Sequence, residues 1–125
     1  MAAKRVVIVG NGRMAQACAD RLLREGSSAV YLLVAERRDD AAQARLVALC
    51  NKADIPILQP ADTINSTEVV AAIGAQAPDL VFSIDNFQIF CAELLATARE
   101  GCINFHNGQL ERYRGVNVPS WAIFN

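Results

Sequence analysis

Residues 5–15 read Arg-Val-Val-Ile-Val-Gly-Asn-Gly-Arg-Met-Ala, and this stretch decides the fold that the sequence predicts. Arg5–Val9 is dominated by valine and isoleucine, which is typical of a parallel strand buried on both faces of its sheet. Gly10-Asn11-Gly12 ends the strand, and Ala15–Arg24 then places apolar residues on one face of a helix. A strand, a glycine-rich turn and a helix in this order predict the first unit of an α/β domain.

The same alternation continues along the chain. Pro56 cannot donate a backbone hydrogen bond, so the strand that contains it is expected near an edge of the sheet. Strands are predicted at Val30–Val34, Ile55–Leu58, Leu80–Ile84 and Cys102–Phe105, and helices at Ala41–Lys52, Ser66–Ala75 and Ala92–Arg99. Because strands and helices alternate, we predict a Rossmann-like parallel sheet with helices on both faces, in one domain over residues 1–125.

Composition narrows the class of protein further. The chain has 125 residues, of which 53% are hydrophobic and 20% charged, and its net charge is −1. This balance argues against broad electrostatic binding to nucleic acid or to an anionic membrane. No apolar run is long enough to cross a bilayer, so we expect a cytoplasmic protein. The four cysteines are far apart and form no CxxC pair, so neither a metal site nor a disulfide framework is expected.

Ligands of parallel sheets bind beyond the carboxyl ends of the strands. Three of the predicted strand ends carry unusual residues, at Gly10–Arg13, Asp85–Phe90 and Asn104–Gly115. Because these ends meet at one edge of the sheet, we expect the functional site there.

The first of these segments has two interpretations. Gly10–Ala15 fits the pattern G-x-G-x-x-A, in which glycines let the backbone approach a ligand and the helix N-terminus favours an anion. Glu36 follows the second strand, where a ribose-binding acid would lie in a dinucleotide fold. Taken alone, these features predict an NAD(P)-binding domain of an oxidoreductase. The simpler interpretation is that the glycines only form a tight corner.

The other two segments suggest different chemistry. Phe87, Ile89 and Phe90 either pack under their loop or form an apolar slot for a flat ring. Asn104 and His106 are two residues apart in a strand and therefore point to the same side. An amide and an imidazole can both donate to an oxygen that gains negative charge, and the imidazole can also move protons near neutral pH. That pair suits acyl transfer.

At this point the sequence resembles a known family. The folate-dependent formyltransferases have the signature N-x-H-P-S-L-L-P-x-Y-x-G, and a tryptophan-containing helix follows it. The C-terminal part of this chain is similar to that pattern, at Asn104-Phe105-His106, Leu110, Arg112–Gly115 and Trp121–Ile123. That family includes methionyl-tRNA formyltransferase and glycinamide ribonucleotide transformylase. The resemblance extends over nearly the whole chain, through Ile55–Pro60, Pro78–Val81, Gln88-Ile89 and Gly10–Gly12.

The resemblance implies a transferase of one-carbon metabolism that moves a formyl group from 10-formyltetrahydrofolate to an amine. Asn104 would hold the formyl oxygen, and His106 would stabilise the developing oxyanion and help proton transfer. The pterin pocket would be lined by Phe87, Gln88, Ile89 and Phe90. The amine acceptor would be bordered by Gly10, Asn11, Gly12 and Arg13.

Departures from the family pattern bear on the acceptor. Where the family has Pro-Ser after the histidine, this chain has Asn107-Gly108. The sequence further on resembles formyltransferase-like domains attached to peptide or polyketide synthetases, at Asn117 and Ser120–Ala122. This favours a small-molecule or carrier-bound amine over tRNA, with further domains of a larger synthetase as partners. Arg13-Met14 departs from the residues that follow the turn in the glycinamide enzyme, which argues against a ribonucleotide acceptor.

One expected group is missing from the sequence. The catalytic aspartate of the family lies a few dozen residues beyond the histidine, and this chain ends at Asn125. We therefore expect the N-terminal, 10-formyltetrahydrofolate-binding part of a formyltransferase catalytic domain, incomplete at its C-terminus and inactive alone. The alternative is a non-catalytic binding module that keeps the fold.

Overall fold

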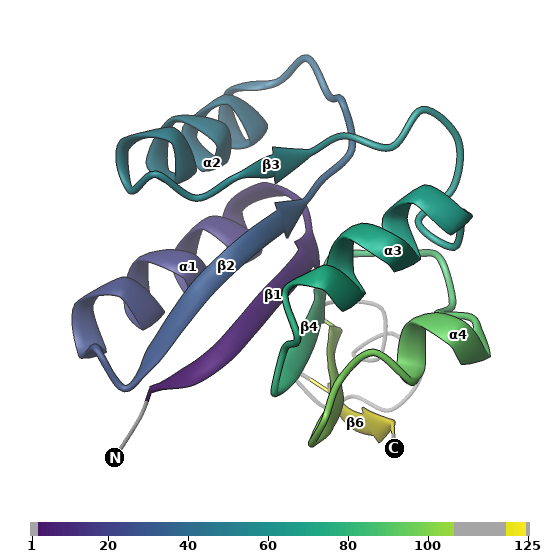
Figure 1. Ribbon diagram of the computed structural model, residues 1–125. Helices are drawn as coiled ribbons and strands as arrows, with labels where there is room; N and C mark the ends of the chain where they lie inside the picture. Colours follow the sequence, from purple (N-terminus) through teal and green to yellow (C-terminus); the bar gives the residue numbers. More distant parts are fainter. Residues whose placement is uncertain (1–2, 107–119, 125) are drawn as a thin grey trace.

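The computed structural model describes residues 3–106 and 120–124. Its elements alternate as the sequence predicts (Figure 1). In chain order they are β1 (Lys4–Gly10), α1 (Gly12–Glu25), β2 (Ser28–Val34), α2 (Ala41–Lys52), β3 (Ile57–Leu58), α3 (Thr67–Ala75), β4 (Leu80–Ile84), α4 (Ala92–Leu95), β5 (Gly101–His106) and β6 (Ser120–Phe124).

One sheet contains all the described strands, in the order β3-β2-β1-β4-β5-β6. The first five strands are parallel, and β6 pairs antiparallel with β5 along the free edge that β5 would otherwise expose. The short strand β3, which follows Pro56, forms the opposite edge. The predicted Rossmann-like parallel sheet is therefore confirmed.

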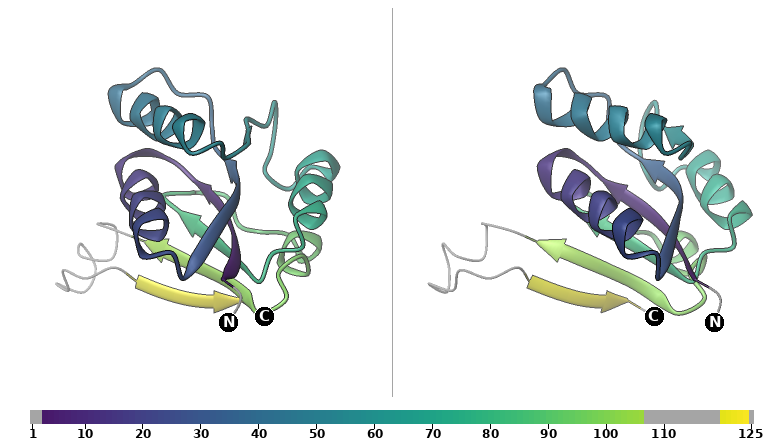
Figure 2. Two further views of the ribbon diagram at one scale, coloured as in Figure 1. Left: turned by 60° about the vertical axis from the view of Figure 1, so that its left-hand side comes forward. Right: turned by 90° about the vertical axis from the view of Figure 1, so that its left-hand side faces the viewer.

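Helices cover both faces of the sheet (Figures 1 and 2). Side chains alternate along β1, so Val6 and Ile8 pack with α1 and α2, whereas Val7 and Val9 pack with α3 and α4. All four are at most 1% exposed, and full burial of such a side chain contributes about 1.5–3 kcal/mol. The uninterrupted run of valine and isoleucine is thus explained by burial on both faces.

Two expected helices differ from the structure, one in its end and one in its type. The helix predicted for Ala92–Arg99 ends at Leu95, because the Thr97 hydroxyl and backbone N–H both donate to the Leu94 carbonyl and the chain then turns into β5. The tryptophan-containing segment, expected as a helix by resemblance, is the strand β6. Its aromatic and β-branched residues suit a strand, and the open edge of β5 supplies the hydrogen-bond partners.

A close backbone approach joins the two central strands. Gly10 pairs with Ile84, and a Cβ atom at Gly10 would lie 2.6 Å from the Ile84 carbonyl oxygen and 3.0 Å from the Ile84 Cβ. The next backbone N–H, that of Asn11, donates to the same carbonyl at 3.1 Å. Gly10 is therefore required by strand packing, whatever the turn binds.

Replacement of Gly10 by alanine is predicted to lower the free energy of unfolding by about 1–3 kcal/mol, because the added Cβ overpacks the site and forces the two strands apart. Gly74→Ala in α3 is the matched control, since its Cβ would meet only Thr97 Cγ2 at 3.9 Å and alanine is the better helix former. Urea denaturation of both variants measures the difference. A Gly10→Ala variant as stable as Gly74→Ala would contradict the packing argument.

Candidate functional site

The sheet brings the three predicted segments to one edge. Gly10 of β1 lies beside Ile84 of β4, and Ile84 lies beside Phe105 of β5. Since the strands are parallel, the turn after β1, the loop after β4 and the end of β5 leave the sheet side by side. This is the carboxyl edge, where parallel sheets bind ligands.

A cavity opens between the loop after β4 and the strand β5. Its volume is about 150 Å³, less than that of most small-molecule pockets and suited to a ring rather than a whole large ligand. The lining residues are Ser83, Asn86, Phe87, Gln88, Ile89, Phe90 and Asn104. All four residues predicted for a ring-binding slot therefore lie at one cavity with Asn104, which is half-buried and pairs in register with Ser83.

The apolar side chains of the loop divide into two groups. Phe90 is 8% exposed and packs in the core cluster that includes Ile64. Phe87 and Ile89 are 74% and 87% exposed. Packing under the loop, one of the two sequence interpretations, thus holds for Phe90 alone, and the other two side chains form an exposed apolar rim.

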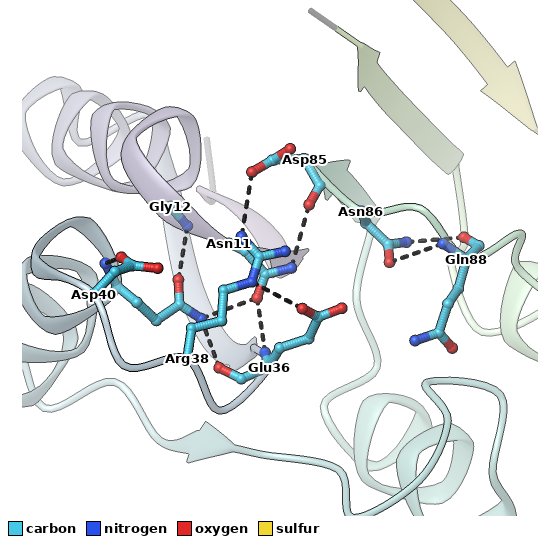
Figure 3. A network of polar contacts seen from close by, with 9 residues as sticks. Asn11, Gly12, Glu36, Arg38, Asp40, Asp85, Asn86 and Gln88 are labelled. Atoms are coloured by element: carbon cyan, nitrogen blue, oxygen red, sulfur yellow. Dashed lines mark hydrogen bonds and ion pairs between the residues drawn. The ribbon is translucent and has the colours of Figure 1, made fainter.

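Buried amide groups fix the loop from inside (Figure 3). Asn86 is 6% exposed; its Nδ2 donates to Ser83 Oγ at 3.1 Å and to the Gln88 carbonyl at 3.0 Å, and its Oδ1 accepts from the Gln88 N–H at 3.3 Å. The Gln88 side chain leads away from Asn86. Its Oε1 accepts from Thr63 Oγ1 at 2.8 Å, so that oxygen is used within the protein.

The glycine turn is bound by a side chain that the sequence analysis missed. Gln43 of α2 is 1% exposed, and its Oε1 accepts a hydrogen bond from the Gly12 N–H at 2.8 Å. Its Nε2 donates to Asn11 Oδ1 at 3.0 Å and to the Glu36 carbonyl at 2.6 Å. The available signal was the spacing of Gln43 with Leu46 and Cys50, which places an amide on the buried face of α2.

These contacts weaken the dinucleotide interpretation. The Gly12 N–H at the start of α1, which an anion would use, is engaged by Gln43. The Glu36 carboxylate accepts from Arg38 Nε at 2.8 Å, and Arg38 also lies 3.6 Å from Asp85 (Figure 3). The Glu36 carboxylate is therefore paired with an arginine, whereas a ribose would need that carboxylate as a hydrogen-bond acceptor.

Part of the predicted site lies outside the described residues. His106 is the last residue of β5, and its side chain is outside the described part, as are Arg112, Arg114 and the rest of residues 107–119. The roles of Asn104 and His106 stay predictions.

Three of the four cysteines are buried or half-buried thiols with no part in this edge chemistry. Burial raises the pKa of the Cys18, Cys50 and Cys102 thiols to about 11, so they are protonated and unreactive at neutral pH. Within residues 3–106 and 120–124, no three His, Cys, Asp or Glu side chains gather closely enough to hold a metal ion. No helix in the same residues is long and apolar enough to cross a membrane.

Comparison with known proteins gives a consistent result. A family model described as "Formyl transferase" matches residues 4–125. A methionyl-tRNA formyltransferase from Geobacter sulfurreducens is 32% identical over 130 residues, which cover 100% of this chain and 41% of the relative. A GDP-perosamine N-formyltransferase from Brucella melitensis is 28% identical over 121 residues, covering 97% of this chain and 46% of the relative. The chain thus spans less than half the length of these relatives.

Solved structures share the fold. Phosphoribosylglycinamide formyltransferase from Bacillus halodurans superposes with a TM-score of 0.68 at 21% identity, over 96% of this chain and 70% of that one. A 4-N formyltransferase from Francisella tularensis gives a TM-score of 0.60 at 18% identity, over 98% of this chain and 50% of that one.

Replacement of Gln43 by leucine is predicted to lower the free energy of unfolding by about 2–4 kcal/mol, because the buried Gly12 N–H loses its acceptor and the Glu36 carbonyl loses a donor, and unsatisfied groups of this kind cost roughly 1–3 kcal/mol apiece. Arg45→Ala, on the exposed face of α2, is the matched control and should change stability by less than about 0.5 kcal/mol. Chemical denaturation compares the two. Equal stabilities would mean that the turn does not depend on Gln43.

Proposed function

Since the chain belongs to the formyl transferase family, we propose that it forms the donor-binding part of an enzyme that transfers a formyl group from 10-formyltetrahydrofolate to an amine. The observation that carries this proposal is the cavity at the carboxyl edge, which joins the loop Phe87–Phe90 to Asn104. The whole protein is expected to be a cytoplasmic transferase.

The donor ring is proposed to occupy this cavity. A pterin is flat, with one polar edge, and needs apolar walls together with a few hydrogen-bonding groups. Phe90 supplies a buried wall, and the exposed side chains of Phe87 and Ile89 would be covered by the ring. The cavity is of a size for a ring, so the rest of the donor would extend out of it.

Asn104 and His106 are proposed to act on the formyl group. As the amine nitrogen forms a bond to the formyl carbon, negative charge develops on the formyl oxygen, and the Asn104 amide would donate a hydrogen bond to it. His106 would donate to the same oxygen and assist transfer of the amine proton to the departing nitrogen of the folate. The carbon–nitrogen bond to the folate then breaks, which leaves formylated amine and tetrahydrofolate.

The acceptor is proposed to approach past the glycine turn. The turn Gly10–Arg13 lies beside the loop of the cavity, but its Gly12 N–H is already bound by Gln43. A phosphate group at this turn would have to displace that side chain, so we propose an acceptor amine that is not anchored there by phosphate. Such an amine belongs to a small molecule or to a carrier of a larger synthetase. A tRNA-bound amine is the second candidate, which the name of the Geobacter relative favours.

A reduced folate is predicted to raise the melting temperature of the protein, because a ligand that binds only the native state adds about 2.7 kcal/mol of stability at 100 times its dissociation constant. NADH should leave the melting temperature unchanged. Phe87→Ala should reduce the rise in melting temperature that folate causes. Leu23→Ala serves as the control, because Leu23 is also an exposed apolar side chain but lies on α1. Stabilisation by NADH and none by folate would support the dinucleotide interpretation instead.

Replacement of Asn104 by alanine in the full-length enzyme is predicted to lower kcat by about 10²–10³-fold and to weaken donor binding much less, because the amide matters most when the oxyanion forms. His106→Ala should act similarly, and the two losses should not add, since both side chains serve one oxygen. Turnover per folded molecule, measured alongside thermal stability, tests both. Variants that lose stability but keep full turnover would assign these residues to strand structure instead.

A further inference from the structure

The loop that lines the cavity is also held from outside, by the segment that leads into α3. Asn65 lies in that segment and hydrogen-bonds two backbone groups of the loop. Its Nδ2 donates to the Ile89 carbonyl at 2.8 Å, and its Oδ1 accepts from the Cys91 N–H at 2.8 Å. One amide therefore spans three consecutive residues of the loop and fixes the residue between them, Phe90.

The contact is reciprocal. Gln88 of the loop extends its side chain to the Asn65 segment, where Oε1 accepts from Thr63 Oγ1 at 2.8 Å and from the Ile64 N–H at 3.0 Å. We call these four hydrogen bonds, made by the side chains of Asn65 and Gln88, the amide clasp. Phe90 and Ile64, one from each side of the clasp, pack in the same buried cluster. Polar and apolar contacts thus fasten the same two segments.

The clasp determines what the loop presents to the cavity. With Phe90 held inward, Ile89 and Phe87 remain exposed at the rim. Asn65 uses the Ile89 carbonyl and the Cys91 N–H, and Asn86 uses the Gln88 carbonyl and N–H. Neither amide engages the backbone groups of Phe87 or Phe90. A ligand in the cavity therefore meets a loop whose shape is set in advance.

We propose that Asn65 is a positioning residue for the formyl donor: it touches no substrate but holds Ile89–Cys91 in the conformation that receives the donor ring. This inference rests on the proposed function of the cavity. A loop fixed before binding loses less conformational entropy when the ligand arrives, so the clasp should lower the donor's KM and leave the chemical step unchanged.

The neighbouring residue offers a matched control. Ser66 follows Asn65 directly and caps α3, where its Oγ accepts from the Val69 N–H at 3.2 Å. Its side chain has no hydrogen bond to the loop after β4 among those in the described part of the chain. Ser66→Ala therefore weakens the same segment without releasing the clasp, and it separates general destabilisation from loss of donor positioning.

The test is steady-state kinetics of the full-length protein with 10-formyltetrahydrofolate, together with calorimetric binding of tetrahydrofolate. Asn65→Ala is expected to raise the donor KM and the dissociation constant about tenfold, with kcat at saturating donor within about twofold of the wild type. Ser66→Ala should leave the donor KM unchanged. Asn65→Asp retains an acceptor for the Cys91 N–H but no donor for the Ile89 carbonyl, so its KM should lie between those of the wild type and Asn65→Ala.

Each outcome has a defined meaning. Equal donor KM values for Asn65→Ala and Ser66→Ala, or a fall in kcat with an unchanged KM, would overturn the positioning role. Should Asn65→Ala fail to fold, Asn65→Asp and Thr63→Val decide the question, because Thr63→Val removes the hydroxyl donor to Gln88 and keeps the shape of the side chain. A wild-type protein that neither binds nor uses the folate would instead refute the proposed function itself.

Discussion

The close approach of β1 and β4 at Gly10 is the constraint on which the site depends. Gly10 has no Cβ, so its backbone can approach the Ile84 carbonyl closely and the two strands stay paired to their carboxyl ends. The Asn11 N–H continues the pairing one residue further. The turn after β1 and the loop after β4 must then leave the sheet side by side. The neighbouring strand β5 follows the same register and adds Asn104 to the shared edge.

A site at this edge needs many backbone groups out of reach of water, and here neutral amide side chains satisfy them. Gln43 binds the turn, and Asn11 of the turn accepts from the Glu36 N–H. Asn86 binds the loop from inside, and Asn65 binds it from outside. Amides suit this role since each carries both donors and an acceptor and brings no charge into a buried position. Buried polar groups that are fully paired hold a single conformation, which is what a preformed ligand site requires.

The sequence predicted local features well and remote partners poorly. Ala41–Lys52 and Leu80–Ile84 have the predicted bounds because hydrophobic periodicity and helix propensity are properties of neighbouring residues. The loop Phe87–Phe90 could be placed at the cavity from strand order alone. Gln43 and Asn65 could not be assigned, since their partners lie 31 and 24 residues away and are chosen by the packing of the finished fold. Trp121 was misplaced on a helix because its strand pairing depends on the free edge of β5.

The two sides of the site differ in how readily a ligand or a substitution could change them. The cavity loop is held by hydrogen bonds between neutral groups, most of them buried or part-buried, and loss of one partner of a buried bond leaves an unsatisfied group behind. On the side of the glycine turn, Glu36, Arg38 and Asp85 form ion pairs with side chains that are 39%, 26% and 41% exposed. Pairs this exposed contribute little, typically about 0–1 kcal/mol, so an arriving ligand can break them at small cost. Under the proposed function, the donor loop is therefore held by amide hydrogen bonds, whereas the ion pairs on the acceptor side can rearrange around a ligand at small cost while Gly10 and Gln43 keep the turn in place.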